Sequence, residues 1–191
     1  IQDRKLIMAL SKIDVANMLT GTIPVDNSKS GSILQVQSTL YNTPFTQAIS
    51  ANTSTAINNL SVNITPSSTS SKIMLFARFM GEYGTATNYD LVFFILRGST
   101  KINVGVSEGD RTTGTIANFM GFYNADADNT PDGTQLVTLD ASHNSTSQLT
   151  YHIGLQTRNA DTMYVNRTVG DSNSTATERF SSEIIAMEIK G

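Results

Sequence analysis

The stretch "LSVNITPSSTSSKIMLFARFMG" (Leu60–Gly81) decides the fold, because it holds two strand patterns and the turn between them. In its first part, three apolar residues alternate with polar ones, which is the period-two pattern of a half-buried β-strand. Pro66 cannot donate a hydrogen bond to a sheet and ends that strand. Ser67 to Ser71 are then expected to form a solvent-exposed loop. The stretch therefore predicts two consecutive strands.

The second strand of this stretch, "KIMLFARFM" (Lys72–Met80), and the later run "LVFFILR" (Leu91–Arg97) are apolar on both faces. Such strands are normally buried on both faces, whereas a two-sheet sandwich covers only the inner face. We expect a second copy of the chain to cover the outer face, and a third layer of loops from the same chain is the alternative. The residues predicted to lie in the core or a subunit interface are Phe76, Phe79, Phe93 and Phe94.

Further strand patterns occur on both sides of this stretch, and turn signals separate them at intervals typical of sandwiches and barrels. No helical pattern follows Thr20. The sequence thus predicts an all-β fold, an antiparallel β-sandwich of jelly-roll type over residues 32–191. The other expected strands are 32–41, 56–65, 101–106, 114–122, 135–140, 148–157, 162–166 and 183–189.

Residues 1–31 differ from the rest and are expected to form an N-terminal arm and linker. A helical stripe over Leu6 to Asn17 indicates a short helix or a segment that lies along a partner. "DNSKSGS" (Asp26–Ser32) is typical of a flexible link. Met8 resembles a natural start, so Ile1 to Ile7 are either additional sequence or part of a longer chain.

Composition narrows the function classes. Hydrophobic residues make up 39% and charged residues only 15% of the chain, against a charged average of about 25%. The net charge of −3 argues against a nucleic-acid partner. There is no cysteine, and hence neither a disulfide nor a thiolate metal site. No apolar run approaches the ~20 residues of a membrane helix, so we expect no membrane insertion and no cofactor.

The run "ITPSSTSSKI", together with "ILQVQST", "FILRGSTKINVG", "MYVNRTVGDSNS" and "SSEIIAMEI", resembles tail-fibre and other virion-surface proteins of marine and freshwater bacteriophages. The leader "MALSKIDVANMLTGTIPVDN" is similar to the start of such proteins. The resemblance implies a non-enzymatic virion structural protein on the particle surface, assembled in the host cytoplasm. It further implies a homotrimeric fibre knob that contacts the host cell, docked to other virion proteins through the arm. The alternative is a capsid decoration protein, of the cement or head-fibre kind, because fibre subunits are usually longer.

One motif suggests an enzyme. "GVSEG" (Gly105–Gly109) matches G-x-S-x-G, and Ser107, Asp140 and His152 follow the order of an α/β-hydrolase triad. That nucleophile elbow needs a helix after the serine, whereas a strand-like run rich in threonine and glycine follows here. We interpret the motif as a hairpin turn and expect no catalytic residue.

The acidic stretch "NADADNTPDG" contains Asp126, Asp128 and Asp132, and clustered carboxylates of this kind can bind calcium. An EF-hand loop counted from Asp126 fails, because Pro131 and Val137 occupy the positions that require glycine and glutamate. We interpret the stretch as a solvated turn, with an opportunistic calcium or sodium ion as the alternative. The two histidines, His143 and His152, are expected to be structural.

Four loops carry the chemistry for polar ligands: Gly81–Asn88, Ser107–Thr113, Asn124–Gly133 and Thr168–Thr177. Loops on a rigid scaffold commonly carry recognition. Their hydroxyl and amide groups suit a host surface glycan, although the absence of tryptophan weakens a free-standing carbohydrate-binding module. The candidate contact residues are Tyr83, Tyr89, Arg111, Asp126, Asp128 and Asp132.

Overall fold

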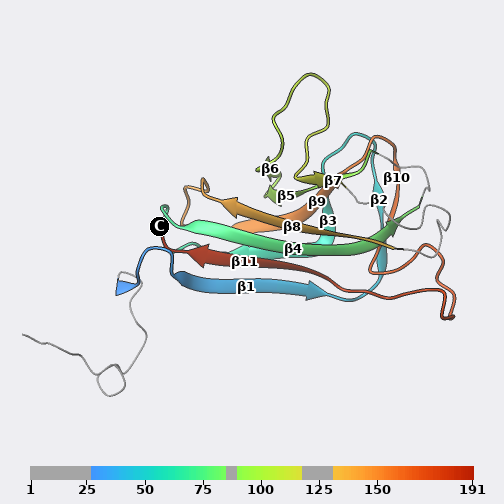
Figure 1. Cartoon of the computed structure of the whole chain (residues 1–191), viewed down its shortest axis with the longest axis horizontal. Coiled ribbons are helices and arrows are strands. Elements are labelled where there is room, and N and C mark those ends of the chain that lie inside the picture. Colours follow the sequence, from blue (N-terminus) through green and yellow to red (C-terminus); the bar gives the residue numbers. More distant parts are fainter. Residues whose placement is uncertain (1–26, 85–89, 118–130) are drawn as a thin grey trace, which may run out of the picture.

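The computed structural model describes residues 27–84, 90–117 and 131–191, and the elements named in these ranges are all β-strands. Eleven strands form two antiparallel sheets that pack face to face (Figure 1). This confirms the predicted all-β antiparallel sandwich. The expected N-terminal arm lies almost wholly outside the described residues, and the first strand of the sandwich begins at Ile33.

The larger sheet, sheet A, has six strands in the order β1-β11-β4-β10-β2, with β8 also paired to β4. Gly81 of β4 pairs with Asp132 of β8 on one side and with Val165 of β10 on the other. Because β11 also pairs with β4, β10 and β11 lie end to end along the same edge of β4. The strands are β1 (Ile33–Tyr41), β2 (Phe45–Ile49), β4 (Lys72–Tyr83), β8 (Asp132–Asp140), β10 (Asp161–Val165) and β11 (Ser182–Ile189).

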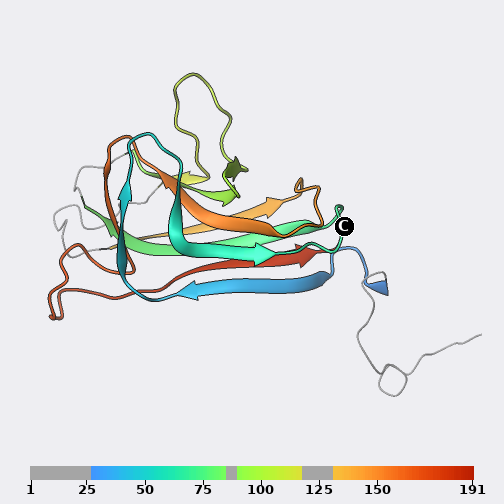
Figure 2. The same cartoon turned by 180° about the vertical axis from the view of Figure 1, so that it is seen from behind.

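The smaller sheet, sheet B, has the order β3-β9-β5-β6, and β7 also pairs with β5. Between β6 and β7 the chain makes a loop that projects away from the sandwich (Figures 1 and 2). The strands are β3 (Thr55–Ile64), β5 (Val92–Arg97), β6 (Thr100–Ile102), β7 (Ile116–Ala117) and β9 (Leu149–Gln156).

The hydrophobic core lies between the two sheets. The alternating apolar residues of β3, such as Leu60 and Ile64, are buried there. Phe79 of β4 and Phe93 of β5 join the sheets, with ring centroids 5.1 Å apart. Aromatic pairs at this separation stabilise a core beyond the area that they bury. The interpretation of Phe79 and Phe93 as core residues agrees with their exposures of 2% and 1%.

The outer faces of the two doubly apolar strands differ from each other. Residues 93–96 of β5 are all buried, as the sequence predicts. The strand β4 alternates instead, with every second residue from Ile73 to Phe79 buried and Phe76 39% exposed on the other face. The described chain therefore leaves the outer face of β4 open.

The serine loop that follows Pro66 is anchored, which corrects the expectation of a purely solvent-exposed loop. The buried carboxylate of Glu188 accepts hydrogen bonds from the backbone N and Oγ of Ser67, at 2.7 and 2.6 Å, and from Nε2 of Gln35 at 2.6 Å. Burial alone raises the pKa of Glu188, but these hydrogen bonds outweigh it and hold the pKa below its ordinary value. The loop thereby closes one end of the sandwich over β11.

The strands largely follow the sequence prediction, although β4 and β8 extend beyond their predicted bounds, to Tyr83 and from Asp132. Of the strand expected over 114–122, residues 118–122 lie outside the described residues. Two further differences concern β2 and β6. β2 (Phe45–Ile49) was not predicted, because it is short and follows Pro44 directly. The run expected over 101–106 ends at Ile102, because Asn103 adopts a left-handed conformation (φ 50°) that turns the chain out of the sheet.

Candidate functional site

Three of the four predicted recognition loops begin or end beside the last residues of β4. Asp132 pairs with Gly81, the backbone N–H of Asn166 donates to Met80 O at 2.9 Å, and that of Val169 donates to the Glu82 carboxylate at 2.5 Å. We call residues 81–84, 131–132 and 166–180 the loop end. The fourth loop, Ser107–Thr113, belongs to the projection between β6 and β7 of sheet B (Figure 1).

Asn166 attaches the loop end to sheet A through hydrogen bonds. It is fully buried and left-handed (φ 59°), a conformation that asparagine tolerates better than most residues. Its side-chain Nδ2 donates to Tyr41 O at 2.8 Å, and its Oδ1 accepts from Ser182 Oγ at 2.7 Å. Its backbone O accepts from Phe180 N at 3.1 Å. The chain therefore leaves the sheet at Asn166 and returns beside it at Phe180.

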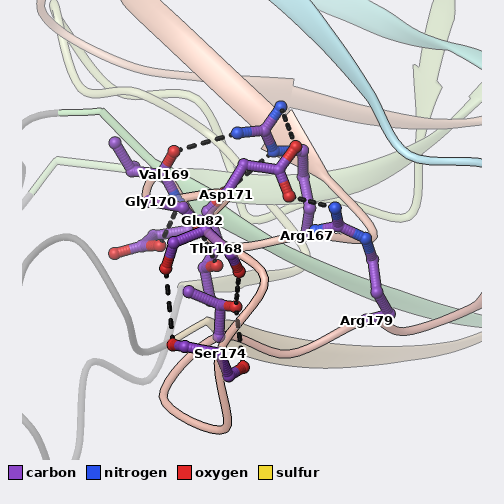
Figure 3. Close-up of polar contacts among 10 residues, drawn as sticks. Glu82, Arg167, Thr168, Val169, Gly170, Asp171, Ser174 and Arg179 are labelled. Atoms are coloured by element: carbon purple, nitrogen blue, oxygen red, sulfur yellow. Dashed lines mark hydrogen bonds and ion pairs between the residues drawn. The ribbon is translucent and has the colours of Figure 1, made fainter.

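The loop between these two residues is closed at its base by ion pairs (Figure 3). The Asp171 carboxylate lies 3.1 Å from the Arg167 guanidinium and also pairs with Arg179. Arg167 in addition donates to the carbonyls of Thr168 and Val169, at 2.9 and 3.0 Å. Charge-assisted hydrogen bonds of this kind are stronger than neutral ones, so the base of the loop is firmly held.

Burial divides the same loop into a base and a tip. Thr168 is fully buried, and the Glu82 carboxylate that receives the Val169 N–H is 5% exposed. Residues 171–176 are exposed, and they present hydroxyl, amide and carboxylate groups to solvent. The Thr177 hydroxyl donates to Ser172 O, which shapes the tip from within. An ordered base with a polar tip suits the binding of a polar ligand through several weak hydrogen bonds.

The structure places three of the six candidate contact residues. Tyr83 lies at the end of β4, where its ring packs against the core and its hydroxyl donates to Asn159 O at 3.0 Å. Burial raises the pKa of Tyr83. Asp132 is half-buried at the start of β8. Arg111 is exposed in the projecting loop and lies 3.6 Å from the Glu108 carboxylate.

The loop end thus contains Tyr83 and Asp132, while Arg111 lies in the loop between β6 and β7 of sheet B. The other candidates, Tyr89, Asp126 and Asp128, lie outside the described residues. Most of the acidic stretch Asn124–Gly133, which suggested a cation site, also lies outside the described residues. Among the residues that the structure describes, no group of three histidine, aspartate or glutamate side chains could hold a metal ion.

The residues of the hydrolase motif have other partners. The buried Asp140 carboxylate accepts two hydrogen bonds from Arg97, at 2.8 and 3.0 Å, and one from Tyr151 Oη at 2.8 Å. Residues 108–115 after Ser107 are turns and coil that lead into β7, not the helix that a nucleophile elbow requires. Asp140 therefore joins the two sheets through Arg97 and Tyr151.

The histidines can be described from their contacts. His143 is buried, and its Nδ1 accepts the backbone N–H of Ser145 at 3.2 Å. Nε2 must then carry the proton, and it donates to Ser71 O at 2.7 Å. His152 is half-buried on β9, and burial lowers its pKa. His143 thus anchors the serine loop.

Sequence reasoning missed Asn166, Glu82 and the Arg167–Asp171–Arg179 group. A usable signal was present, because Arg167 and Asp171 are separated by one glycine-containing turn and Arg179 precedes the final strand. Asn166 carried no signal of its own in a chain so rich in asparagine. Its importance arises because β10 and β11 share one edge of β4, which is a property of the topology.

No protein-family model matches this chain, and a search of curated proteins finds no significant match. Within the described ranges, no helix has the length and apolar character needed to cross a membrane. Function therefore has to be inferred from the loop end and from the open face of sheet A.

Proposed function

We propose that this chain is a non-enzymatic structural protein of a bacteriophage virion surface, a trimeric fibre knob whose loop end contacts the host cell. The observation that carries the proposal is the loop end itself. A rigid sandwich presents a polar tip whose base is fixed by the buried Asn166 and by the ion pairs of Asp171. A fixed base lowers the entropy cost of ordering the tip on a ligand.

The ligand class is a host cell-surface glycan. The exposed tip offers Ser172, Asn173, Ser174 and Thr175, whose hydroxyl and amide groups match the hydrogen-bonding groups of sugars. Each such hydrogen bond contributes only ~0.5–1.5 kcal/mol net, so one site binds weakly. Three copies on one knob would strengthen attachment by about 10²–10⁴-fold through avidity.

The test is binding of the purified full chain to host cells, compared with cells whose surface glycans have been removed enzymatically. We expect binding to intact cells and its loss on stripped cells. The variant Asn173→Ala/Thr175→Ala should weaken binding, because it removes two exposed tip side chains for which the structure gives no hydrogen bond to another described residue. Thr69→Ala, in the serine loop at the opposite end of β4, is the matched control and should bind normally.

A capsid decoration protein is the second candidate, and the open outer face of sheet A favours it. A broad apolar sheet face suits flat contact with another protein of the shell. Virions that lack this chain separate the two candidates. Loss of adsorption supports the fibre knob, whereas normal adsorption with reduced capsid stability contradicts it and supports decoration.

A further inference from the structure

The outer face of sheet A carries two adjacent apolar rows, one across four strands and one across three. In antiparallel pairs, residues directly opposite each other lie on the same face. The strand registers thus align one row of Leu139, Met74, Met187 and Val36, and a second of Val137, Phe76 and Ile185. Val137 is 58% exposed, Val36 51% and Phe76 39%. Contiguous exposed apolar surface of this kind marks an interaction site.

The next row on the same face is polar and contains both signs of charge. Gln135, Arg78 and Glu183 lie opposite one another on β8, β4 and β11. Arg78 donates to Ser181 Oγ at 3.1 Å. Within the described part of the chain, no ion pair involves Arg78 or Glu183. One cation and one anion thus lie opposite each other at the border of the apolar rows, with no ion pair to another described residue.

A shallow hollow of about 190 Å³ lies where the apolar and charged rows meet. A cavity of roughly 150 Å³ can accommodate a benzene ring, so this hollow can take an aromatic or branched side chain. The hollow is open to solvent and lies beside Phe76, which is itself such a side chain. The outward-facing residues among those that line it are Phe76, Arg78, Gln135, Val137, Glu183 and Ile185.

We propose that this face binds neighbouring copies of the same chain in the trimer, with the apolar rows packed together and Arg78 of each copy facing Glu183 of the next. The charge pattern selects this occupant. A face with one cation beside one anion is complementary to itself, whereas a partner of a single charge sign would leave one of the two groups opposed. A closed symmetric assembly buries such a face in every copy.

The inference deepens the proposed function, because it names the surface through which copies of the knob assemble. Cell binding and molecular mass are measured separately, so failure of one does not imply failure of the other. A single-copy chain that still binds host glycans would contradict the assembly, and with it the trimeric form of the knob, but not the glycan-binding function. An oligomer that binds no cells would contradict only the glycan-binding function.

The experiment compares the mass of the full wild-type chain in solution with those of Val137→Lys and Val106→Lys, by light scattering at micromolar concentration. Val106 is the matched control, because it is a valine outside the proposed interface. It lies in the projecting loop and is 94% exposed, compared with 58% for Val137. We expect the wild type and Val106→Lys to have the mass of several copies. Val137→Lys should need at least about a tenfold higher concentration to associate, because a buried, unpaired ammonium is costly.

Reversal of charge tests the contact between copies. Arg78→Glu and Glu183→Arg each place two like charges in the row and should weaken association, whereas the double variant Arg78→Glu/Glu183→Arg should restore it. Circular dichroism spectra like that of the wild type would show that all variants fold. The inference is overturned if the wild type has the mass of one copy, or if Val137→Lys associates as well as Val106→Lys. If the wild type has the mass of one copy, a hydrophobic dye distinguishes two explanations. Dye binding would indicate that the outer face of sheet A serves another partner, and no dye binding would indicate that the same chain covers that face.

Discussion

The outward faces of β4 and β5 have the same kind of sequence and opposite environments. Phe76 on β4 is 39% exposed, whereas Phe94 on β5 is fully buried although it points away from the core between the sheets. Phe94 is covered because β6 folds back beside β5 and brings Lys101 Nζ to 4.2 Å from the ring centroid. Lys101 is held there by hydrogen bonds to Gln156 Oε1 and Thr113 O, at 2.7 and 2.8 Å.

The backbone opposite Phe94 is adapted to this cover. Gly154 pairs with Phe94, and a Cβ at Gly154 would lie 2.6 Å from the Phe94 ring. The glycine therefore makes room for the aromatic side chain on the outer face of sheet B. An apolar outer face of a strand thus predicts that the face is buried, but it does not identify the segment or the chain that covers it. In sheet B it is the same chain, and in sheet A we infer a second copy.

The largest effect should come from truncating Phe94, and Phe76 on the open face is the comparison. Phe94→Ala should lower the free energy of unfolding by ~3–5 kcal/mol, because it leaves a cavity in a fully buried site. Phe76→Ala should cost less than ~1 kcal/mol within one chain, because that side chain is partly solvated already. Urea denaturation at a concentration that favours single chains checks both values. Equal costs would show that the two faces do not differ.

A smaller effect is expected at the glycine that accommodates Phe94. Gly154→Ala should destabilise the chain by ~1–3 kcal/mol, since the new methyl group overlaps the ring and forces it to move. Gly105→Ala is the matched control, because no atom of the described residues lies within 4 Å of a Cβ built there. Thermal unfolding of the two variants compares them, and a stable Gly154→Ala chain would contradict the tight packing of Phe94.

The smallest effect should appear in the pH dependence of stability that comes from Lys101, the residue that covers the Phe94 ring. Burial lowers the pKa of Lys101 below its ordinary 10.5. Between the lowered pKa of the folded chain and 10.5, the unfolded chain therefore holds the Lys101 proton more readily than the folded chain does. The stability of the wild type should therefore rise relative to Lys101→Met as the pH increases toward 10.5. Denaturation of both proteins between pH 7 and 10.5 measures the difference, and parallel curves would contradict the partial burial of the Lys101 ammonium.

Local patterns predicted the strands well, because alternation and turn residues are short-range properties. β3 follows its alternation, with Leu60 and Ile64 buried as expected. The sequence of β4 was interpreted as non-alternating because Met74 and Phe76 are apolar, although they lie on the face opposite Ile73 and Leu75. Sequence shows which residues are apolar, but not which of them the described chain covers.

The loop end was predictable only in part, for a physical reason. The polar tip at residues 171–176 was recognised from its composition, whereas its attachment depends on residues that are distant in the sequence. Asn166 is bound to Tyr41, which is far away along the chain, and Val169 to Glu82. Buried carboxylates such as Glu82 and Glu188 look like surface residues in a sequence, and only the fold supplies their donors.

The excursion from Asn166 to Phe180 leaves and re-enters sheet A at one point, between two strands that share an edge of β4. The registers of β10 and β11 are fixed by β4 and do not depend on the number of residues between them. Insertions or deletions at the exposed tip should therefore leave the sandwich intact. Such a segment can diversify between related chains while its scaffold stays constant, so the tip is the natural place to graft a new binding specificity.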